Sequence, residues 1–189
     1  MNKRLIRRLA VLLALSMLLA VRFIGERFSP PEKASHEEQR SSGREYFRVI
    51  RVHDGDTVTA MIAGKTEKIR LVGIDAPEIG QRSWGQKAKR HIEEILDSSD
   101  RSVSLEYDIE TRDRYGRLLA YLWTKDGKML NRTMIEDGYA LLLTVPPNVM
   151  HVEEFKVSQE SARRSKSGIW GSDGLREKPS DYRKRGRGR

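Results

Sequence analysis

The sequence predicts an α+β fold, mostly β, built as a five-stranded barrel of the OB type with about three helices. Two observations favour this class. Short stretches rich in β-branched and aromatic residues, separated by turn signals, dominate the first part of the chain, and helical periodicity appears later. The length of 189 residues, 38% of them hydrophobic, suits a single domain with extensions. Five short strands with inserted helices are typical of a small closed barrel.

The expected strands cover residues 46–52, 57–62, 66–74, 102–107 and 118–123. The first two flank the turn His-Asp-Gly-Asp at 53–56, and Ala-Gly-Lys at 63–65 forms the next turn. Asp-Gly at 126–127 is the turn signal after the last strand.

Three helices are expected. Residues 83–96 place Ala88, Ile92 and Leu96 on one face, which is the spacing of an amphipathic helix. Residues 130–137 form a shorter helix that stops at Gly138, and residues 149–165 form a longer one. We therefore expect the folded domain to cover residues 46–171.

Residues 1–25 have the pattern of an export signal. Basic residues at 3, 4, 7 and 8 precede an apolar run at 9–21 that is broken only by Ser16. The run is shorter than the roughly 20 residues of an ordinary membrane span. A cleaved signal, a membrane anchor through residues 5–24 and an amphipathic or buried helix all stay open. The first two place the rest of the chain outside the cytoplasm. Polar residues 26–45, with a proline pair, predict a flexible linker.

Residues 172–189 predict a basic disordered tail. They hold seven Lys and Arg against three Asp and Glu, and the tail either binds phosphates non-specifically or is merely solvated. Residues 46–171 hold twenty basic and nineteen acidic residues, so the net charge of +9 comes from the two ends and says little about the domain. The absence of cysteine excludes disulfides and thiolate chemistry.

Three short segments gather carboxylates and arginines. Their sequences are Asp-Gly-Asp-Thr at 54–57, Arg-Leu-Val-Gly-Ile-Asp-Ala-Pro-Glu at 70–78, and Asp-Arg-Tyr-Gly-Arg at 113–117. Hydrolysis of a phosphodiester requires cations on the phosphate oxygens and a group that deprotonates or aligns water. Carboxylates bind a hard divalent cation, and the guanidinium fork binds two phosphate oxygens at once. The three segments therefore fit phosphodiester hydrolysis.

Arg70 and Asp75 would point to opposite faces of a regular strand, because side chains alternate along it. For both to reach one substrate, the strand must bend or end before Asp75. Gly73 and Pro77 make such an interruption plausible. Glu78 then projects from a loop, where catalytic groups commonly lie.

The order of these segments, on a β-then-α background, resembles the thermonuclease (staphylococcal-nuclease-like) family over about residues 46–170. The resemblance implies a calcium-dependent endonuclease that cleaves DNA and RNA and leaves 3′-phosphate ends; we expect a monomer. One alternative is a non-catalytic nucleic-acid-binding module on the same barrel. Another, compatible with catalysis, is an envelope protein whose basic tail tethers it to anionic polymers.

The resemblance also implies how calcium and water are held. Asp56 and Asp75 match the carboxylates that bind calcium, and Ala76 matches a position that offers its main-chain carbonyl. Glu78 matches the general base, or the residue that orients the attacking water.

Further matches concern the substrate. Arg70 and Arg117 correspond to the phosphate-binding arginines, and Arg114 and Tyr115 to positions that contact the terminal phosphate. One departure is that residues 142–147 lack the tyrosines that the family places near the nucleotide base.

Two acidic residues in these segments have a structural interpretation from the sequence alone. Asp54 is expected to be a turn residue, and Asp113 is expected to hold its loop rather than to bind metal.

Overall fold

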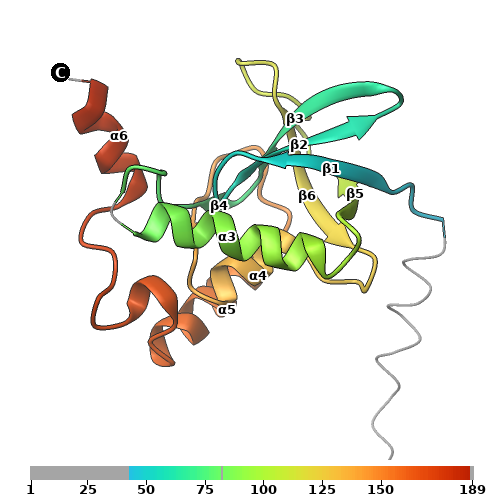
Figure 1. Ribbon diagram of the computed structural model, residues 1–189. Helices are drawn as coiled ribbons and strands as arrows, with labels where there is room; N and C mark the ends of the chain where they lie inside the picture. Colours follow the sequence, from blue (N-terminus) through green and yellow to red (C-terminus); the bar gives the residue numbers. More distant parts are fainter. Residues whose placement is uncertain (1–42, 82, 188–189) are drawn as a thin grey trace, which may run out of the picture. The chain divides into compact units, whose positions relative to one another are not determined.

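Five strands close into a barrel in the order β1-β2-β3-β6-β5 (Figure 1). Neighbouring strands are antiparallel except β3 and β6, which pair in parallel. Pairing of Phe47 with Val103 closes the barrel between β1 and β5. The α+β class and the five-stranded barrel are thus confirmed. The strands are β1 (Phe47–Val52), β2 (Thr57–Ile62), β3 (Lys65–Leu71), β5 (Ser102–Glu106) and β6 (Leu118–Thr124).

The computed structural model describes residues 43–81 and 83–187. The predicted export signal at 1–25 and most of the predicted linker at 26–45 lie outside these residues. None of the helices within them has both the length and the apolar character of a transmembrane segment. Signal cleavage, membrane anchoring and localisation stay predictions from the sequence.

Alternation along the strands decides which side chains fill the barrel. Val49, Val58 and Ile69 are fully buried in its core. In β3, Ile69 and Leu71 point inward, whereas Arg70 between them is only partly buried. Because successive side chains face opposite sides of a strand, Arg70 lies on the outer face of the barrel.

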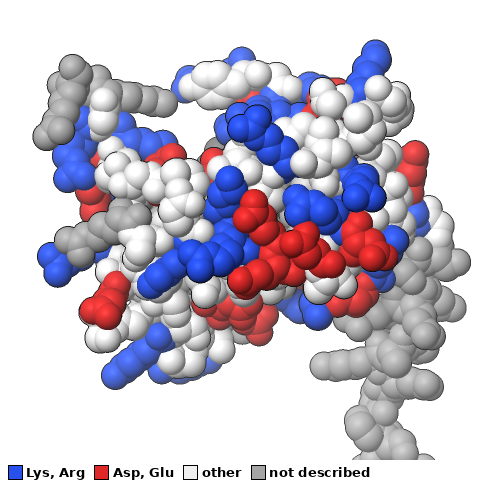
Figure 2. All heavy atoms as spheres, in the orientation of Figure 1, with Lys and Arg blue, Asp and Glu red and all other residues white. Residues whose placement is uncertain are grey.

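Three helices match the predicted ones to within a few residues. Helix α3 (Trp84–Asp97) buries Ala88, Ile92 and Leu96, the face that its periodicity predicts. Helix α4 (Leu130–Glu136) packs against β6 and against α5 (Val152–Arg164). On the face in Figure 2, acidic side chains gather in a band across the middle, and basic side chains lie around it.

The predicted strand at 66–74 is broken after Leu71. Gly73 has a φ of 79°, and a Cβ there would lie 2.6 Å from the ring of Phe155, so only glycine fits this position. Beyond the break, β4 (Ile74–Asp75) pairs with β7 (Leu141–Leu142) in a separate two-stranded sheet. The break therefore carries Asp75 out of the barrel, as the sequence requires if Arg70 and Asp75 are to meet.

The prediction of a disordered tail at 172–189 is wrong for most of that segment. After η1 (Gly168–Trp170), the chain continues into helix α6 (Pro179–Arg187). Pro179 suits the first helical turn, and Asp181 there complements the helix dipole. The folded domain thus extends well past residue 171. Composition alone suggested disorder because it does not reveal the tertiary contacts that hold this segment.

Asn131 links three parts of the domain. Its side chain is fully buried, its Oδ1 accepts a hydrogen bond from Leu122 N (3.0 Å), and its Nδ2 donates to Val72 O (2.8 Å). Helix α4 is thereby joined to β6 and to the segment where β3 ends. This amide satisfies backbone groups that water cannot reach.

We predict that Asn131→Ala lowers the free energy of unfolding by about 2–3 kcal/mol, because it leaves a buried N–H and a buried carbonyl unpaired. Chemical denaturation of the full chain measures this loss. Gln86→Ala, which removes an exposed amide from α3, is the matched control. Equal losses for the two variants would contradict the role of Asn131.

Candidate active site

A cleft of about 610 Å³ opens where the 53–56 turn, β3, the loop after β4 and the 113–117 loop meet. Six of the eight predicted site residues line it: Asp56, Arg70, Glu78, Arg114, Tyr115 and Arg117. The other two, Asp75 and Ala76, are buried directly beside these residues. The fold therefore brings the three sequence segments to one place.

Arg70 joins the two predicted metal carboxylates. Its Nη2 lies 3.2 Å from Asp56 Oδ2 and 3.8 Å from Asp75 Oδ1. Both carboxylates are almost fully buried, at 7% and 4% exposure. Oxygens from two separate segments thus converge on one guanidinium nitrogen.

The strand break fixes the position of this guanidinium. Arg70 Nη1 donates to Leu71 O and Nη2 donates to Ile74 O, each at 2.8 Å. These two carbonyls flank the break, so the bend that releases Asp75 also creates the acceptors for Arg70. A guanidinium has five N–H donors, and Arg70 retains donors for a further anion.

Negative charge accumulates at this end of the cleft. Burial raises the pKa of Asp75, an effect that the neighbouring guanidinium groups of Arg183 and Arg70 oppose. Burial and the nearby Asp56 raise the pKa of Asp54 to about 6. Protonated Asp54 therefore contributes to the free energy of unfolding. This contribution is fully present below the ordinary pKa of Asp54 and is lost as the pH rises through about 6. A bound cation would relieve this repulsion.

Asp54 also has the structural role that the sequence suggested. Its Oδ1 accepts a hydrogen bond from Asp56 N at 3.0 Å, which closes the turn before β2. This turn fixes the backbone position of Asp56.

The donor set fits a hard divalent cation. Ala76 N donates to Asp56 Oδ2 at 2.9 Å, so the backbone at Ala76 lies against the first carboxylate. In the described part of the chain, no three carboxylate or histidine side chains form a ready-made metal site. Asp56, Asp75 and a carbonyl nevertheless supply the oxygen donors that calcium prefers, and water or substrate can complete its coordination.

Glu78 projects from the loop between β4 and α3. Gln81 braces this loop, because its N donates to Glu78 O (2.8 Å) and its Oε1 accepts from Glu78 N (3.3 Å). The Glu78 side chain is 34% exposed and reaches the cleft. Its Oε1 accepts a hydrogen bond from Arg183 Nη1 at 2.8 Å.

Asp113 organises the opposite wall of the cleft, as the sequence suggested. Its Oδ2 accepts a hydrogen bond from Arg117 Nε at 2.7 Å and forms an ion pair with Arg117 Nη2 at 2.7 Å. Its Oδ1 accepts from the backbone N of Tyr115 and Arg117. Although burial opposes the shift, these hydrogen bonds lower the pKa of Asp113. Arg114 Nη2 donates to the hydroxyl of Tyr115, whose ring is largely exposed.

Arg183, which the sequence did not predict as a site residue, lines the same cleft. Its segment was interpreted from its basic composition alone. The helix-start signal at Pro179 and Asp181 was available, but no local pattern shows which helix face meets a carboxylate.

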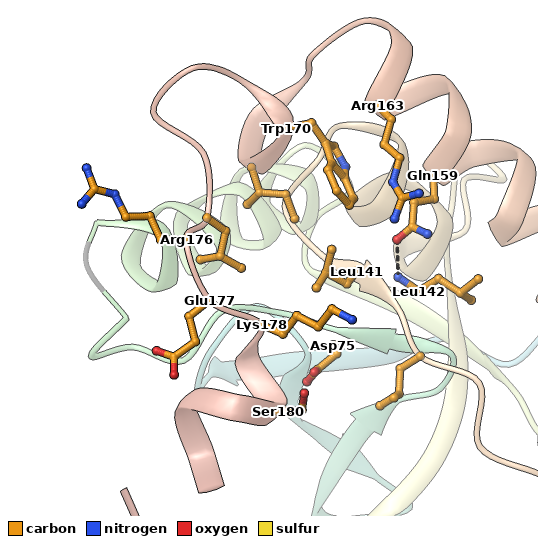
Figure 3. Close-up of a pocket in the computed structure, with 13 residues that line it drawn as sticks. Asp75, Leu141, Leu142, Gln159, Arg163, Trp170, Arg176, Glu177, Lys178 and Ser180 are labelled. Atoms are coloured by element: carbon orange, nitrogen blue, oxygen red, sulfur yellow. Dashed lines mark hydrogen bonds between the residues drawn. The ribbon is translucent and has the colours of Figure 1, made fainter. Parts of the chain in front are cut away.

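A second hollow of about 540 Å³ also borders Asp75 (Figure 3). Trp170 and Gln159 line it, with Lys178 and Ser180 from the C-terminal segment. The Gln159 side chain accepts a hydrogen bond from Leu142 N at 3.0 Å, which braces β7. Asp75 therefore lines this second hollow, whereas its partners Arg70 and Arg183 line the first cleft.

Comparison with known proteins identifies a matching family and several similar proteins. Residues 68–172 match the family described as Staphylococcal nuclease homologue. The chain is 32% identical to a thermonuclease of Staphylococcus hyicus, over 89% of this chain and 98% of that protein. It is 34% identical to a thermonuclease of Staphylococcus intermedius, over 74% and 83% of the two chains. An endonuclease of Bacillus subtilis, YncB, is 32% identical over 66% and 61%.

We predict that Gly85→Ala destabilises the loop that carries Glu78. A Cβ at position 85 would clash with the carbonyl oxygen of Glu78 and lie 2.7 Å from Ile79 Cα. The expected loss in the free energy of unfolding is about 1–3 kcal/mol, the usual range for overpacking. Gly186→Ala, where a Cβ meets nothing within 4 Å, is the control in the same denaturation experiment. Full stability of Gly85→Ala would contradict the packing described.

Proposed function

Because the chain belongs to the family of staphylococcal nuclease homologues and is a nuclease, we propose that it is a calcium-dependent endonuclease. Its proposed substrates are DNA and RNA, and its proposed products carry 3′-phosphate ends. The observation that carries this proposal is the convergence of Asp56, Asp75, Arg70, Glu78 and Arg117 on one cleft.

The proposed cation site consists of the carboxylates of Asp56 and Asp75 and the main-chain carbonyl of Ala76. When bound there, calcium supplies positive charge beside the attacked phosphate. Burial of both carboxylates supports this assignment, because water competes poorly for charged groups in a site of low dielectric constant. Arg70, between the two carboxylates, keeps them in place when the site is free of metal.

Glu78 is proposed to act on the water molecule. In the proposed reaction a water oxygen attacks phosphorus and the bond from phosphorus to the 5′ oxygen breaks. The phosphate then stays on the 3′ oxygen, the attacking water gives up a proton, and the departing 5′ oxygen takes up a proton to become a hydroxyl group. Glu78 is a suitable acceptor or orienting group because its side chain reaches the cleft from a braced loop.

The two arginines are proposed to stabilise the charge that develops on the phosphate. Arg70 approaches from β3, and Arg117 approaches from the opposite wall, where Asp113 fixes its Nε and Nη2. Such prearranged cations lower the barrier because they need no reorientation during the reaction. Arg114 and Tyr115 line the same cleft and are proposed to contact the terminal phosphate of the substrate.

The N-terminal sequence supports a proposal about location. A basic region followed by an apolar run at 9–21 is typical of an exported protein. We propose that the nuclease domain acts outside the cytoplasm, as a monomer, either released or anchored through residues 5–24.

We predict that Glu78→Gln and Arg117→Ala each lower turnover on single-stranded DNA at least ~100-fold, the scale of losing one charge-stabilising group. Steady-state cleavage by the full chain in calcium measures this. Glu160→Gln and Arg164→Ala, exposed positions on α5, are the matched controls. A fall of only a few fold for Glu78→Gln would sink the role given to it. Intact binding without any cleavage by the natural chain would favour a binding module instead.

A separate prediction concerns the requirement for calcium and the chemical ends of the products. A chelator should abolish cleavage, and added calcium should restore it, because the proposed site relies on a bound metal ion to stabilise the charge on the attacked phosphate. The fragments should carry a 3′ phosphate that a phosphatase removes, seen as a mobility shift on a sequencing gel. Cleavage in excess chelator would contradict the metal assignment, and 5′-phosphate ends would contradict the proposed leaving group.

A further inference from the structure

The C-terminal segment is anchored beside the cleft. Trp84 Nε1 donates to Asp173 O at 2.9 Å, and Gln81 Nε2 donates to Glu177 O. Leu175 N donates to Ile169 O at 3.1 Å, which ties the segment to η1. These contacts fix the approach to α6 at three points.

Helix α6 itself packs on the loop that carries Glu78. A Cβ at Gly80 would lie 2.7 Å from the hydroxyl of Tyr182, so this contact is close. Arg185 Nη2 lies 2.9 Å from Glu177 Oε2, which ties the helix to the residues that precede it. The helix therefore lies beside the loop that leads into α3 (Figure 1).

This position of α6 places one guanidinium on two site carboxylates. Arg183 Nη1 lies 2.8 Å from Glu78 Oε1, and Nη2 lies 2.9 Å from Asp75 Oδ1. The Arg183 side chain is 35% exposed, and the Asp75 side chain is 5% exposed. The Oδ1 that Arg183 binds is also the atom that lies 3.8 Å from Arg70 Nη2.

Arg183 therefore uses an oxygen that a cation at Asp56 and Asp75 needs. A charge-assisted hydrogen bond to a nearly buried carboxylate is strong, and a calcium ion held by Asp75 would use the same oxygen lone pairs. The same guanidinium holds Glu78, so one side chain restrains both a proposed metal ligand and the proposed water-orienting group.

The position of α6 also divides the surface. Asp75 borders the second hollow together with Lys178 and Ser180, whereas Arg183 lines the catalytic cleft. Ser180 and Asp75 both line the second hollow (Figure 3). A shift of α6 away from Asp75 would open one hollow toward the other.

We propose that helix α6 is a built-in competitor of the catalytic cation. In the metal-free chain Arg183 holds Asp75 and Glu78, and calcium must displace it to complete the site. Phosphates of the nucleic acid offer the released arginine an alternative partner. Substrate binding therefore favours the state in which Arg183 has left Asp75 and Glu78. This inference rests on the proposed function.

If Arg183 had a positioning role instead, the opposite change in calcium affinity would be expected. If Arg183 positioned Glu78 for catalysis, its removal would weaken or leave unchanged calcium binding and would lower turnover. A competitor, once removed, strengthens calcium binding.

Calcium titration of the full chain by calorimetry, without nucleic acid, tests the proposal. Arg183→Gln should bind calcium about tenfold more tightly, which corresponds to the loss of about one charge-assisted hydrogen bond. Arg183→Lys should fall between, because a lysine keeps the charge but cannot bind two carboxylates as a fork. Lys184→Gln, an equal change of charge on an 80% exposed neighbour, should leave the affinity unchanged.

Hydrogen exchange provides a readout that a general charge effect would not change. Calcium should reduce amide protection in residues 179–187 of the natural chain, because α6 leaves its docking site. Weaker or unchanged calcium binding by Arg183→Gln, or α6 protection that calcium does not change, would overturn the proposal while calcium-dependent cleavage still stood. If neither the natural chain nor any variant bound calcium, both this proposal and the proposed metal dependence would fail.

Discussion

The guanidinium of Arg70 is the contact on which the site depends. It donates to the carbonyls of Leu71 and Ile74 and faces the carboxylates of Asp56 and Asp75. A single side chain thus stabilises the break in β3 and holds two buried negative charges near each other. Two such carboxylates would repel strongly without a cation between them. In the metal-free chain the arginine provides that charge.

Much of this arrangement could be predicted from the sequence. The alternation of β3 places Arg70 outside the barrel, and Gly73 provides the break that lets Asp75 approach it. The barrel strands followed from β-branched runs and turn signals, and α3 followed from its apolar face. Local patterns suffice for these features because each depends on steric or periodic preferences of neighbouring residues.

Other features depend on contacts between distant segments. The pairing of β4 with β7 joins two very short strands whose sequences carry no strand signal of their own. The sequence does not predict helix α6, because the segment that leads into it is held by Trp84 and Gln81, almost a hundred positions earlier in the chain. Arg183 was consequently grouped with a basic tail, although its side chain lies on Asp75 and Glu78. Composition describes the charge of a segment but not its partner.

The most direct measurement is a crystal structure of the full chain grown with calcium and a short phosphorothioate oligonucleotide, with the metal located by anomalous scattering. The account predicts a calcium ion bound by Asp56 and Asp75, a phosphate between Arg70 and Arg117, and Arg183 withdrawn from both of its carboxylates. A calcium ion bound elsewhere, or a phosphate that avoids the cleft, would contradict the proposed site. A filled calcium site with Arg183 still on Asp75 and Glu78 would contradict the competition between them.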